Sequence, residues 1–330
     1  MSDTEKNIET VCAVVVTYNR KNLLLECLEA LRRQTRPLQG IYIIDNASTD
    51  GTPELLLEKG YIKELPPKDL KEPWEKEFEI DNLTNGESIK IHYVRMHENT
   101  GGAGGFYEGV KRGYEKGYDW LWLMDDDAEP KEDTLEKLLK VKELNTNENI
   151  YNCVLCPLII MKDGKVQSYH HKKINKILGT EKPAIKFSKI EEIKAKNLFK
   201  EIDANAFVGP LLHRCIIEKV GYPKKELFIW GDDLEFTFRI KQKGFKIKLV
   251  MNAFIFHKDS GYAFAKKLPK DQYWKVYFGT RNRIFITKNY FSLFSLFYWI
   301  MRILFSFLKN KDIDLYKIKL RGLKDGLNFE

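Results

Sequence analysis

The chain has 330 residues, enough for one large α/β domain with an appendage or for two small domains, and either would bury a sizeable core. Its hydrophobic fraction of 43% is ordinary for a soluble protein, and its net charge of +8 fits phosphorylated substrates, an anionic membrane surface or nucleic acid equally well. The five cysteines lie in apolar segments and follow no secretory signal peptide, which argues against a disulfide framework and indicates a reduced, cytoplasmic setting.

Predicted strands and helices alternate in the first half of the chain. The apolar run at residues 11–16 predicts a strand buried on both faces. A helix is predicted after it, with Asn19 as its cap, because apolar residues recur at helical spacing at Leu24, Cys27, Leu28 and Leu31. Residues 41–44 predict the second strand, and Thr52-Pro53 begins the next helix, with proline at its first position.

Residues 89–94 and 120–124 predict a third and a fourth strand. This β-α-β-α order predicts an α/β protein with an open, doubly wound, mostly parallel sheet flanked by helices. In such a sheet the ligand site lies at the carboxyl ends of the strands. Residues 64–88 are charged, contain three prolines and show weak periodicity, so we interpret them as an excursion before the third strand.

A polar segment follows each of the four predicted strands, at residues 17–20, 45–51, 99–105 and 125–127. The rule for parallel sheets places all four along one rim, where one pocket could use them together. We expect Asp45 and its neighbours to hold a base and a ribose in this pocket. The residues predicted to contact its ligand are Thr17, Tyr18, Arg20, Asp45, Asn46, Asn99, Gly104, Gly105 and Asp126.

The triplet Asp125-Asp126-Asp127 directly follows the apolar strand at residues 120–124. Three carboxylates at the end of a buried strand are costly unless a positive group lies beside them. A divalent cation such as Mg²⁺ or Mn²⁺ prefers carboxylate oxygens and leaves positions open for substrate phosphates. The triplet therefore predicts a metal that carries a diphosphate, and hence an enzyme that acts on nucleotide sugars.

The loop at residues 99–105 contains four glycines but does not match the dinucleotide fingerprint G-x-G-x-x-G. Its glycines would let the backbone approach a ligand or turn sharply into a helix that we expect to start at Phe106. A tight turn without any ligand role is the alternative.

Two further groups of residues that could carry chemistry are interpreted as structural. Cys153 and Cys156 have the C-x-x-C spacing, but they lie in an apolar segment, residues 152–160, that is typical of a buried strand and has no second ligand pair. His170 and His171 have no supporting motif, so we expect them at the surface.

The four polar segments and the residues around them resemble the successive signatures of family 2 glycosyltransferases. They are Val14-Val-Val-Thr-Tyr-Asn-Arg20, Asp45-Asn-Ala-Ser-Thr-Asp-Gly51, Asn99-Thr-Gly-Gly-Ala-Gly-Gly105 and Trp122-Leu-Met-Asp-Asp-Asp127. The glycine loop and the triplet are most similar to the bacterial galactofuranosyltransferase branch, with rhamnosyltransferases as close relatives. The resemblance runs from Val11 to His257 and implies a GT-A fold, a nucleoside-diphosphate-sugar donor and transfer with inversion of configuration.

A second acidic motif lies in Leu227-Phe-Ile-Trp-Gly-Asp-Asp-Leu-Glu235, which enters a predicted helix. Carboxylates at the amino end of a helix are also ordinary capping groups. The resemblance implies instead that Asp233 is the general base and that the acceptor is bound by Trp230, Asp232 and Glu235. In the galactofuranosyltransferases the tryptophan usually abuts the acidic pair, whereas Gly231 intervenes here. This difference weakens the assignment of the donor sugar more than the assignment of the reaction class.

His257 follows the apolar run at residues 245–256, where a lone histidine is often a structural residue. The resemblance implies that it completes the metal site with Asp125 and Asp127. The expected reaction is attack by an acceptor hydroxyl, deprotonated by Asp233, on the anomeric carbon opposite the departing nucleoside diphosphate. We expect galactofuranose from UDP-galactofuranose as the donor sugar, dTDP-rhamnose as the runner-up, and a glycan or lipid-linked acceptor in cell-surface polysaccharide synthesis.

Residues 290–308 are densely aromatic and aliphatic, and the basic residues Lys309, Lys311, Lys317, Lys319, Arg321 and Lys324 follow them. The apolar segment is marginal for a spanning helix, because Arg302 lies toward one end. Residues 290–324 instead predict an amphipathic element that holds the enzyme at the inner face of the cell membrane. Packing of this element on the catalytic domain or on a second subunit is an equal alternative. Upstream, residues 273–283 resemble a segment of rhamnosyl- and galactofuranosyltransferases that contributes to the floor of the site.

The expected organisation is a catalytic domain at residues 1–260, with a nucleotide-sugar half at 1–130 and an acceptor half at 131–260, and a mainly helical region at 261–330. Two other classes of protein are weighed against a transferase, and nucleic acid is not an expected partner. A sugar-phosphate nucleotidyltransferase would share the sheet and the metal carboxylates, but it should carry a basic, glycine-rich phosphate loop after its first strand. A non-catalytic nucleotide-sugar-binding protein would have no use for Asp233 beside a metal triplet.

Overall fold

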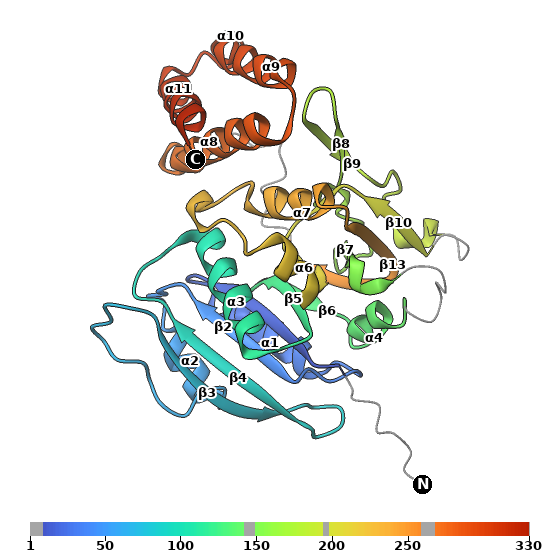
Figure 1. Ribbon diagram of the computed structural model, residues 1–330. Helices are drawn as coiled ribbons and strands as arrows, with labels where there is room; N and C mark the ends of the chain where they lie inside the picture. Colours follow the sequence, from blue (N-terminus) through green and yellow to red (C-terminus); the bar gives the residue numbers. More distant parts are fainter. Residues whose placement is uncertain (1–8, 142–148, 194–197, 259–267, 330) are drawn as a thin grey trace.

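The computed structural model describes residues 9–141, 149–193, 198–258 and 268–329, without the side chains of residues 309 and 310. One large sheet dominates this part of the chain (Figure 1). Its strands lie in the order β10-β13-β7-β12-β5-β1-β2-β4-β3, and β6 pairs with β13. The bounds of these strands are β1 (Val11–Thr17), β2 (Gly40–Asp45), β3 (Trp74–Asp81), β4 (Ser88–Arg95), β5 (Trp120–Asp125), β6 (Ala128–Pro130), β7 (Cys153–Ile160), β10 (Phe199–Ile202), β12 (Leu211–His213) and β13 (Lys246–His257).

Strands β5, β1, β2 and β4 are parallel to one another, and β13 is parallel to β7. Antiparallel pairs occur at the two edges of the sheet, where β3 joins β4 and β10 joins β13, and at β12 between β5 and β7. The predicted α/β fold, a mostly parallel sheet flanked by helices, is confirmed. The carboxyl ends of β1, β2, β4 and β5 meet at one rim, as expected for parallel neighbours.

Helices cover both faces of the sheet, so every residue of β1 is buried. Its odd-numbered apolar residues belong to a core that also contains apolar residues of α1 (Lys21–Arg32), α2 (Thr52–Glu58) and α4 (Thr134–Leu139). Its even-numbered apolar residues belong to a second core with residues of α3 (Gly101–Lys116), α6 (Arg214–Val220) and α7 (Asp232–Gln242). Burial on both faces explains the continuous apolar run in this strand.

Helix α1 begins differently from the prediction. Its N-cap is Arg20, with no side-chain capping hydrogen bond, so the assignment of Asn19 as the cap is wrong. Asn19 has a φ of 55°, and its Oδ1 accepts a hydrogen bond from the backbone N–H of Thr49 at 2.6 Å. Asparagine tolerates this left-handed conformation, and here it joins the loop after β1 to the turn after β2.

Helix α3 begins at Gly101, five residues before the predicted start at Phe106. The glycines of the loop therefore form the first turns of the helix. A Cβ at Gly105 would lie 2.4 Å from Val16 Cγ1, and one at Gly109 would lie 2.2 Å from Val14 Cγ1. Glycine at these positions lets α3 approach β1 more closely than any side chain would allow.

The segment at residues 64–88 contains strand β3, which the sequence did not reveal. Its outward residues Glu75, Glu77 and Glu79 are exposed, whereas Phe78 is buried against the neighbouring core. The strand pairs antiparallel with β4 along its whole length. A charged outer face is common on edge strands because it discourages pairing with another chain.

A three-stranded sheet, β11 (Ala204–Asn205), β8 (His171–Asn175) and β9 (Thr180–Pro183), lies beside the large one. His171 is fully buried, with its Nδ1 2.7 Å from Asn205 Oδ1, and His170 is only 8% exposed. The prediction that both histidines lie at the surface is wrong, because His171 begins β8 and pairs with Asn205 of β11, while the ring of His170 packs beside Gln167 and His257. Cys153 and Cys156 lie in the buried strand β7, as predicted.

Four helices follow the last strand, α8 (Tyr273–Tyr290), α9 (Leu293–Leu304), α10 (Ser306–Asn310) and α11 (Ile313–Asn328), and they lie beyond α7 in Figure 1. Helices α8 and α11 cross closely at Gly322 and Gly326, where a Cβ would lie 2.8 Å and 2.5 Å from carbonyl oxygens of α8. Within the described ranges, none of the helices combines the length and the apolar character needed to cross a bilayer. The division into domains at residue 260 stays a prediction.

Candidate active site

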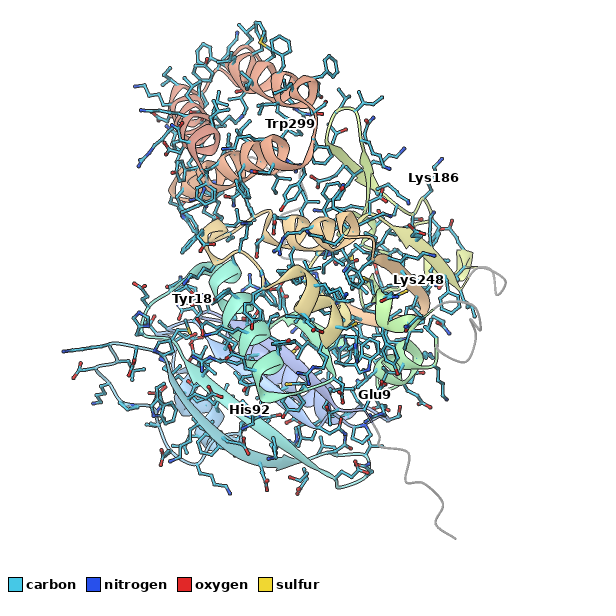
Figure 2. The ribbon with its side chains drawn as sticks, in the orientation of Figure 1. Glu9, Tyr18, His92, Lys186, Lys248 and Trp299 are labelled. Carbon is cyan, nitrogen blue, oxygen red and sulfur yellow. The ribbon has the colours of Figure 1, made fainter. Side chains whose placement is uncertain are left out.

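The aspartate triplet lies at the carboxyl end of β5, beside the end of β1. Asp126 Oδ2 accepts a hydrogen bond of 2.7 Å from Thr17 Oγ1. Arg20 Nη1 lies 3.3 Å from Asp126 Oδ1 and 2.9 Å from Asp127 Oδ2. The end of β1 and the segment after it therefore supply one hydroxyl and one cation to two of the three carboxylates, and Tyr18, between Thr17 and Arg20 in the chain, is 44% exposed (Figure 2).

Burial and mutual repulsion perturb the acids of the triplet. Burial, with the charges of Asp127 and Asp126, raises the pKa of Asp125 well above its ordinary value. Burial also raises the pKa of Asp126 to about 6, although Arg20 and Thr17 act in the opposite direction. For Asp127 the interactions with His257 and Arg20 outweigh burial and lower the pKa. One arginine does not neutralise this cluster, which favours a further cation.

His257 reaches the triplet from the end of β13, with its Nε2 3.2 Å from Asp127 Oδ1. Gln167 holds the opposite side of the ring, since its Oε1 lies 3.0 Å from His257 Nδ1 and its Nε2 donates to the backbone carbonyl of His257. An amide oxygen only accepts, so Nδ1 carries the proton that points to Gln167, and Nε2 is the ring nitrogen that faces Asp127.

Asp127 Oδ1 is a buried oxygen without a hydrogen-bond partner in the described part of the chain. His257 Nε2 and this carboxylate oxygen thus lie 3.2 Å apart, and an imidazole nitrogen with a carboxylate oxygen is a donor set that fits a Mn²⁺ or Mg²⁺ ion. No three His, Cys, Asp or Glu side chains among the described residues are already clustered as a metal site. Asp127 and His257 are therefore a pair of candidate ligands that the fold already brings together.

The turn after β2 is built around two residues that were predicted to bind the donor. Asp45 is fully buried, and it accepts hydrogen bonds from Arg95 Nη1 at 2.6 Å, Tyr93 Oη at 2.8 Å and the backbone N–H of Ser48 at 2.9 Å. With both oxygens occupied, Asp45 orders the turn and does not face a ligand, which corrects the prediction of direct contact.

Asn46 joins this turn to the glycine loop. It is 1% exposed, and its Nδ2 donates to Asn99 Oδ1 at 3.1 Å and to the carbonyl of Gly101 at 2.9 Å. Its Oδ1 accepts from the N–H of Thr100 at 3.0 Å. Asn46 is therefore a positioning residue as well, whereas Asn99 is exposed at the rim.

The glycines at the start of α3 serve different purposes. Cβ atoms at Gly104 and Gly105 would lie 2.3 Å from Thr100 Oγ1 and 2.4 Å from Val16 Cγ1, so packing explains these two positions. At Gly102 the nearest atom is Asp232 Oδ2, at 3.9 Å, which leaves open space. Gly102, rather than Gly104 or Gly105, is the glycine that faces the acidic motif of the second half.

The loop before α7 has an unusual backbone. Phe228 and Trp230 both have a φ of 63°, and Gly231, the N-cap of α7, has a φ of 101°. Side chains in this left-handed region are costly and persist only where the surroundings hold them. Asn282 of α8 does so, because its Nδ2 donates to the carbonyls of Leu227, Ile229 and Trp230 at 2.8, 3.0 and 2.9 Å.

The two aspartates that begin α7 point in different directions. Asp232 faces Gly102 and adds to the negative potential at Asp125. Its pKa is raised to about 7 by burial and by the charge of Asp233. Asp233 lies near Lys172, whose pKa its charge helps to raise, and its Oδ1 accepts the N–H of Leu234. The structure thus brings Asp232, more than Asp233, toward the triplet.

Glu235 does not belong to an acceptor site. It is fully buried, forms an ion pair of 2.8 Å with Arg239 Nε, and also accepts a hydrogen bond from Tyr290 Oη. The prediction of an acceptor contact is wrong because the arginine one helical turn away and a tyrosine of α8 occupy the carboxylate. Trp230, by contrast, is 40% exposed beside the acidic pair.

Two residues of this site were missed at the level of sequence. Gln167 lies 90 positions from His257 in the chain, and no local pattern announces their contact. Asn282 lies in the segment at residues 273–283 that resembled the floor of a related site, so that resemblance was a usable signal.

Comparison with known proteins places these features in a family. The sequence profile described as Glycosyl transferase family 2 matches residues 12–66 and 76–209, more than half of the chain. Galactofuranosyltransferase GlfT1 of Mycolicibacterium smegmatis is 26% identical over 257 residues, which cover 76% of this chain and 71% of that protein. GlfT1 of Mycobacterium tuberculosis strain H37Rv is 25% identical over 249 residues, with 76% and 70% covered.

Solved structures share the fold. GalNAc-T7, solved with UDP, GalNAc and Mn²⁺, superposes with a TM-score of 0.60 at 15% identity, covering 98% of this chain and 57% of that one. Residues 1–349 of Staphylococcus aureus TarS in complex with UDP superpose with a TM-score of 0.54 at 14% identity, covering 96% and 80%. The match to a transferase profile also argues against a nucleotidyltransferase. This chain belongs to glycosyl transferase family 2 and has the GT-A fold.

Proposed function

We propose that this protein is an inverting, metal-dependent glycosyltransferase that moves a sugar from a nucleoside diphosphate to an acceptor hydroxyl. The observation that carries the proposal is the pair of atoms Asp127 Oδ1, a buried oxygen without a hydrogen-bond partner among the described residues, and His257 Nε2, 3.2 Å apart at the carboxyl end of the sheet. The charge of Asp232, at the start of α7, acts on Asp125, and Asp232 Oδ2 lies 3.9 Å from where a Cβ of Gly102 would be. A metal site with an acidic pair near it, in a chain of family 2, supports this reaction.

The donor is held by the rim of the parallel strands. Asp125, Asp127 and His257 would hold Mn²⁺ or Mg²⁺, which when bound would neutralise charge on the leaving diphosphate. Arg20 is half-exposed beside the same carboxylates and adds a fixed positive charge for that diphosphate. Tyr18 and Asn99 are exposed at the rim and are available to the nucleoside, whereas Asp45, Asn46 and Thr17 act through the loops that they fix.

The acidic pair supplies the base. The resemblance to the family assigns this role to Asp233, with Asp232 and Trp230 on the acceptor. One observation favours Asp232 instead: it faces Gly102 and the triplet, and its pKa of about 7 suits proton transfer near neutral pH. Either carboxylate would take the proton of the acceptor hydroxyl as it attacks the anomeric carbon opposite the leaving group, so no covalent enzyme intermediate is needed.

UDP-galactofuranose is the donor that the relatives favour, since the curated proteins to which the chain is similar are galactofuranosyltransferases. dTDP-rhamnose is the second donor to test, because of the similarity to rhamnosyltransferases. The acceptor would be a glycan or a lipid-linked glycan of a cell-surface polysaccharide, and residues 290–324 would bring the enzyme to the inner face of the membrane. Lys309, part of that basic segment, has a side chain outside the described residues.

The test combines nucleotide binding with turnover. Thermal unfolding of the purified protein is followed with UDP, UDP-galactofuranose, dTDP-rhamnose, UDP-galactose and UDP-glucose, with and without Mn²⁺, because a ligand of the native state raises its stability. Metal-dependent stabilisation that is lost in Asp127→Ala supports the donor site. Release of the nucleoside diphosphate from the preferred donor should fall at least about 100-fold in the variant that removes the true base, when Asp232→Asn and Asp233→Asn are compared.

The control is Asp163→Asn, the same substitution at an exposed aspartate outside the site. It should keep both metal-dependent stabilisation and turnover. No response of the wild-type protein to any nucleotide, in the presence or absence of metal, would contradict the proposal.

A further inference from the structure

A cavity lies beside the loop that carries the acidic pair, between that loop and the C-terminal helices. It has a volume of about 280 Å³ and is lined by Trp230, Val276, Gly279, Thr280, Arg283, Trp299, Arg302, Ile303, Ser306 and Lys319. Trp230 connects the cavity with the acidic pair, since it lines the cavity and precedes Asp232 by two residues. The cavity is therefore joined to the proposed acceptor side through one short loop.

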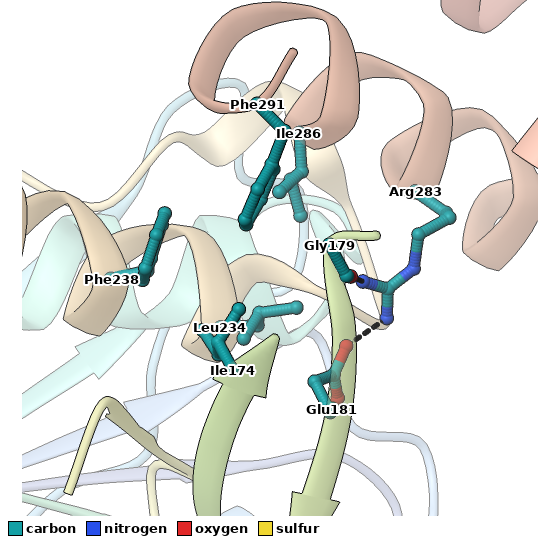
Figure 3. Close-up of a pocket in the computed structure, with 8 residues that line it drawn as sticks. All are labelled: Ile174, Gly179, Glu181, Leu234, Phe238, Arg283, Ile286 and Phe291. Atoms are coloured by element: carbon teal, nitrogen blue, oxygen red, sulfur yellow. Dashed lines mark hydrogen bonds and ion pairs between the residues drawn. The ribbon is translucent and has the colours of Figure 1, made fainter. Parts of the chain in front are cut away.

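Three cations line this space. The charge of Arg283 is already paired, because its Nη2 forms an ion pair with Glu181 of β9 (Figure 3). In the described part of the chain, neither Arg302 nor Lys319 forms an ion pair with an acidic side chain. The charge of Arg302, after burial, helps to lower the pKa of Lys319. Two like charges thus approach each other without compensation, which costs energy unless an anion binds between them.

Aromatic and hydroxyl groups complete the lining. The guanidinium carbons of Arg283 and Arg302 lie 4.8 Å and 4.9 Å from the ring centroid of Trp299, so one indole orders both cations. Trp299 is itself fixed by a hydrogen bond of 3.1 Å from its Nε1 to the carbonyl of Leu178. Thr280 and Ser306 add hydroxyl donors. Fixed cations with hydroxyls around a small cavity are suited to phosphate oxygens.

We propose that this cavity binds a phosphate or diphosphate group carried by the sugar acceptor. The inference rests on the proposed function, because it takes the acidic pair beside Trp230 to be the place where the acceptor hydroxyl reacts. The cavity is too small for a whole glycan and matches a charged group on one. An acceptor held there by its phosphate would have its sugar end directed past Trp230 toward Asp232 and Asp233.

The test measures binding of inorganic diphosphate, farnesyl diphosphate and farnesol to the full chain in EDTA, by titration calorimetry. Chelation removes the divalent ion on which donor binding is proposed to depend. Wild-type protein should bind farnesyl diphosphate, and Lys319→Gln and Arg302→Gln should each weaken this binding at least tenfold. Lys317→Gln is the matched control, because it removes a lysine from the same helix outside the cavity and should leave binding unchanged.

The arms of the experiment separate the sources of the phosphate. Farnesyl diphosphate that binds more tightly than inorganic diphosphate supports a lipid-borne group, whereas equal affinity would overturn the assignment to an acceptor. Wild-type binding that Lys319→Gln leaves unchanged would overturn the site itself. Thermal stabilisation by UDP and Mn²⁺, measured on the same variants, reports on the donor site and on folding. If UDP and Mn²⁺ do not stabilise the wild-type protein although it binds farnesyl diphosphate, the proposed function is rejected and the anion site is retained.

Discussion

The carboxylate of Asp127 is held by groups from three distant segments. Arg20 lies after β1, His257 ends β13, and Gln167 fixes the imidazole from the loop after β7. Gln167 Oε1 lies 3.0 Å from both His257 Nδ1 and His170 Nε2, so it accepts from two rings at once. Such outer groups orient a metal-binding histidine and fix its tautomer.

Replacement of Gln167 by leucine should therefore weaken metal binding without removing a ligand. We expect Gln167→Leu to bind Mn²⁺, in the presence of UDP, about 10- to 100-fold more weakly than the wild type. Titration calorimetry measures the affinity, and circular dichroism verifies the fold. Asp163→Asn, on the exposed turn that precedes Gln167, is the control. Unchanged Mn²⁺ affinity in Gln167→Leu would mean that His257 is not a ligand.

Asp232 should make stability depend on pH. Its pKa is about 7 in the folded protein and 3.8 as the ordinary value, so the native state binds the extra proton between these values. The free energy of unfolding therefore falls as pH rises from about 4 through 7. Asparagine does not titrate, so Asp232→Asn should be more stable than the wild type at pH 8, on the order of 2 to 4 kcal/mol, and similar at pH 4.

Urea unfolding of the metal-free protein at pH 4, 6 and 8 measures this difference. Glu218→Gln, an exposed acid on α6, should show no pH-dependent gain. A constant difference between Asp232→Asn and the wild type across this range would show that Asp232 is not protonated in the native state at neutral pH.

The sequence identified some residues of the candidate site correctly, whereas the roles of others depend on contacts that only the structure shows. The triplet and Arg20 stand in motifs that follow β5 and β1, and the fold brings these motifs into contact. Trp230 also stands in a motif, in the loop before α7. Whether an acid faces a ligand or a partner depends on contacts that motifs do not encode. Asp45 is occupied by Arg95, 50 positions away, and could not be judged from sequence. Glu235 forms an ion pair with Arg239, four residues later in the same helix. This spacing is visible in the sequence and predicts an ion pair as the alternative to an acceptor contact.

At the scale of elements, α3 shows how glycine positions a helix against a strand. Its first turns lie close to the end of β1, where the triplet's partner Thr17 is found. Gly105 faces Val16, whereas Gly102 in the same turn faces open space near Asp232. The two positions can be compared by substitution to alanine, since they lie in the same helix and only a methyl group at Gly105 would overlap a neighbouring side chain.

Gly105→Ala should destabilise the protein by about 1 to 3 kcal/mol, because its Cβ would overlap Val16 and push α3 from the sheet. Gly102→Ala should not, since alanine favours a helix over glycine by up to about 1 kcal/mol and meets nothing closer than 3.9 Å. Chemical denaturation of both variants provides the comparison. Equal stability of the two variants would contradict the close packing of α3 on β1.

The strands that sequence predicted and those that it missed differ in burial. β1, β2 and β5 are buried on both faces, which forces continuous apolar runs that stand out in the sequence. β4 is fully buried only from Ile91 to Val94. β3 lies at an edge and carries glutamates on its outer face. β12 spans three residues, too few for any period to show. The start of α3 was misplaced because four glycines predict a turn, whereas packing against the sheet makes a helix of them.

At the scale of the whole molecule, the C-terminal helices leave an apolar surface uncovered. Leu293, Phe294 and Phe297 of α9 are 85%, 59% and 59% exposed, and Leu304 and Leu308 continue the series. The other side of α9 is partly buried against α8 and α11 through Ile303 and Trp299. With Lys311, Lys317 and Lys324 exposed nearby in the chain, this surface has the composition of an interfacial membrane element.

The chain should therefore bind anionic vesicles in preference to zwitterionic ones. We expect cosedimentation with vesicles of phosphatidylglycerol and phosphatidylcholine, less binding to phosphatidylcholine alone, and a decrease with salt, because basic groups are attracted to an anionic surface. The double variant Phe294→Ser, Phe297→Ser should lower binding at least tenfold. Leu83→Ser is the control, since Leu83 is 48% exposed on the loop between β3 and β4, far from α9 in the fold.

The alternative occupant of this surface is a second copy of the chain, and the same variants decide between them. An apolar face that pairs two copies would make the wild type a dimer in sedimentation velocity and the double variant a monomer, with no effect of anionic lipid. A face that meets a membrane leaves the oligomeric state of both proteins alike and moves only the vesicle fraction. Because α9 also carries Trp299 and Arg302 of the proposed anion site, a membrane-bound orientation would set that cavity at the lipid surface, where a phosphorylated acceptor lipid is presented. Dimerisation through α9 would instead cover the approach to it, so the outcome decides how an acceptor reaches Trp230.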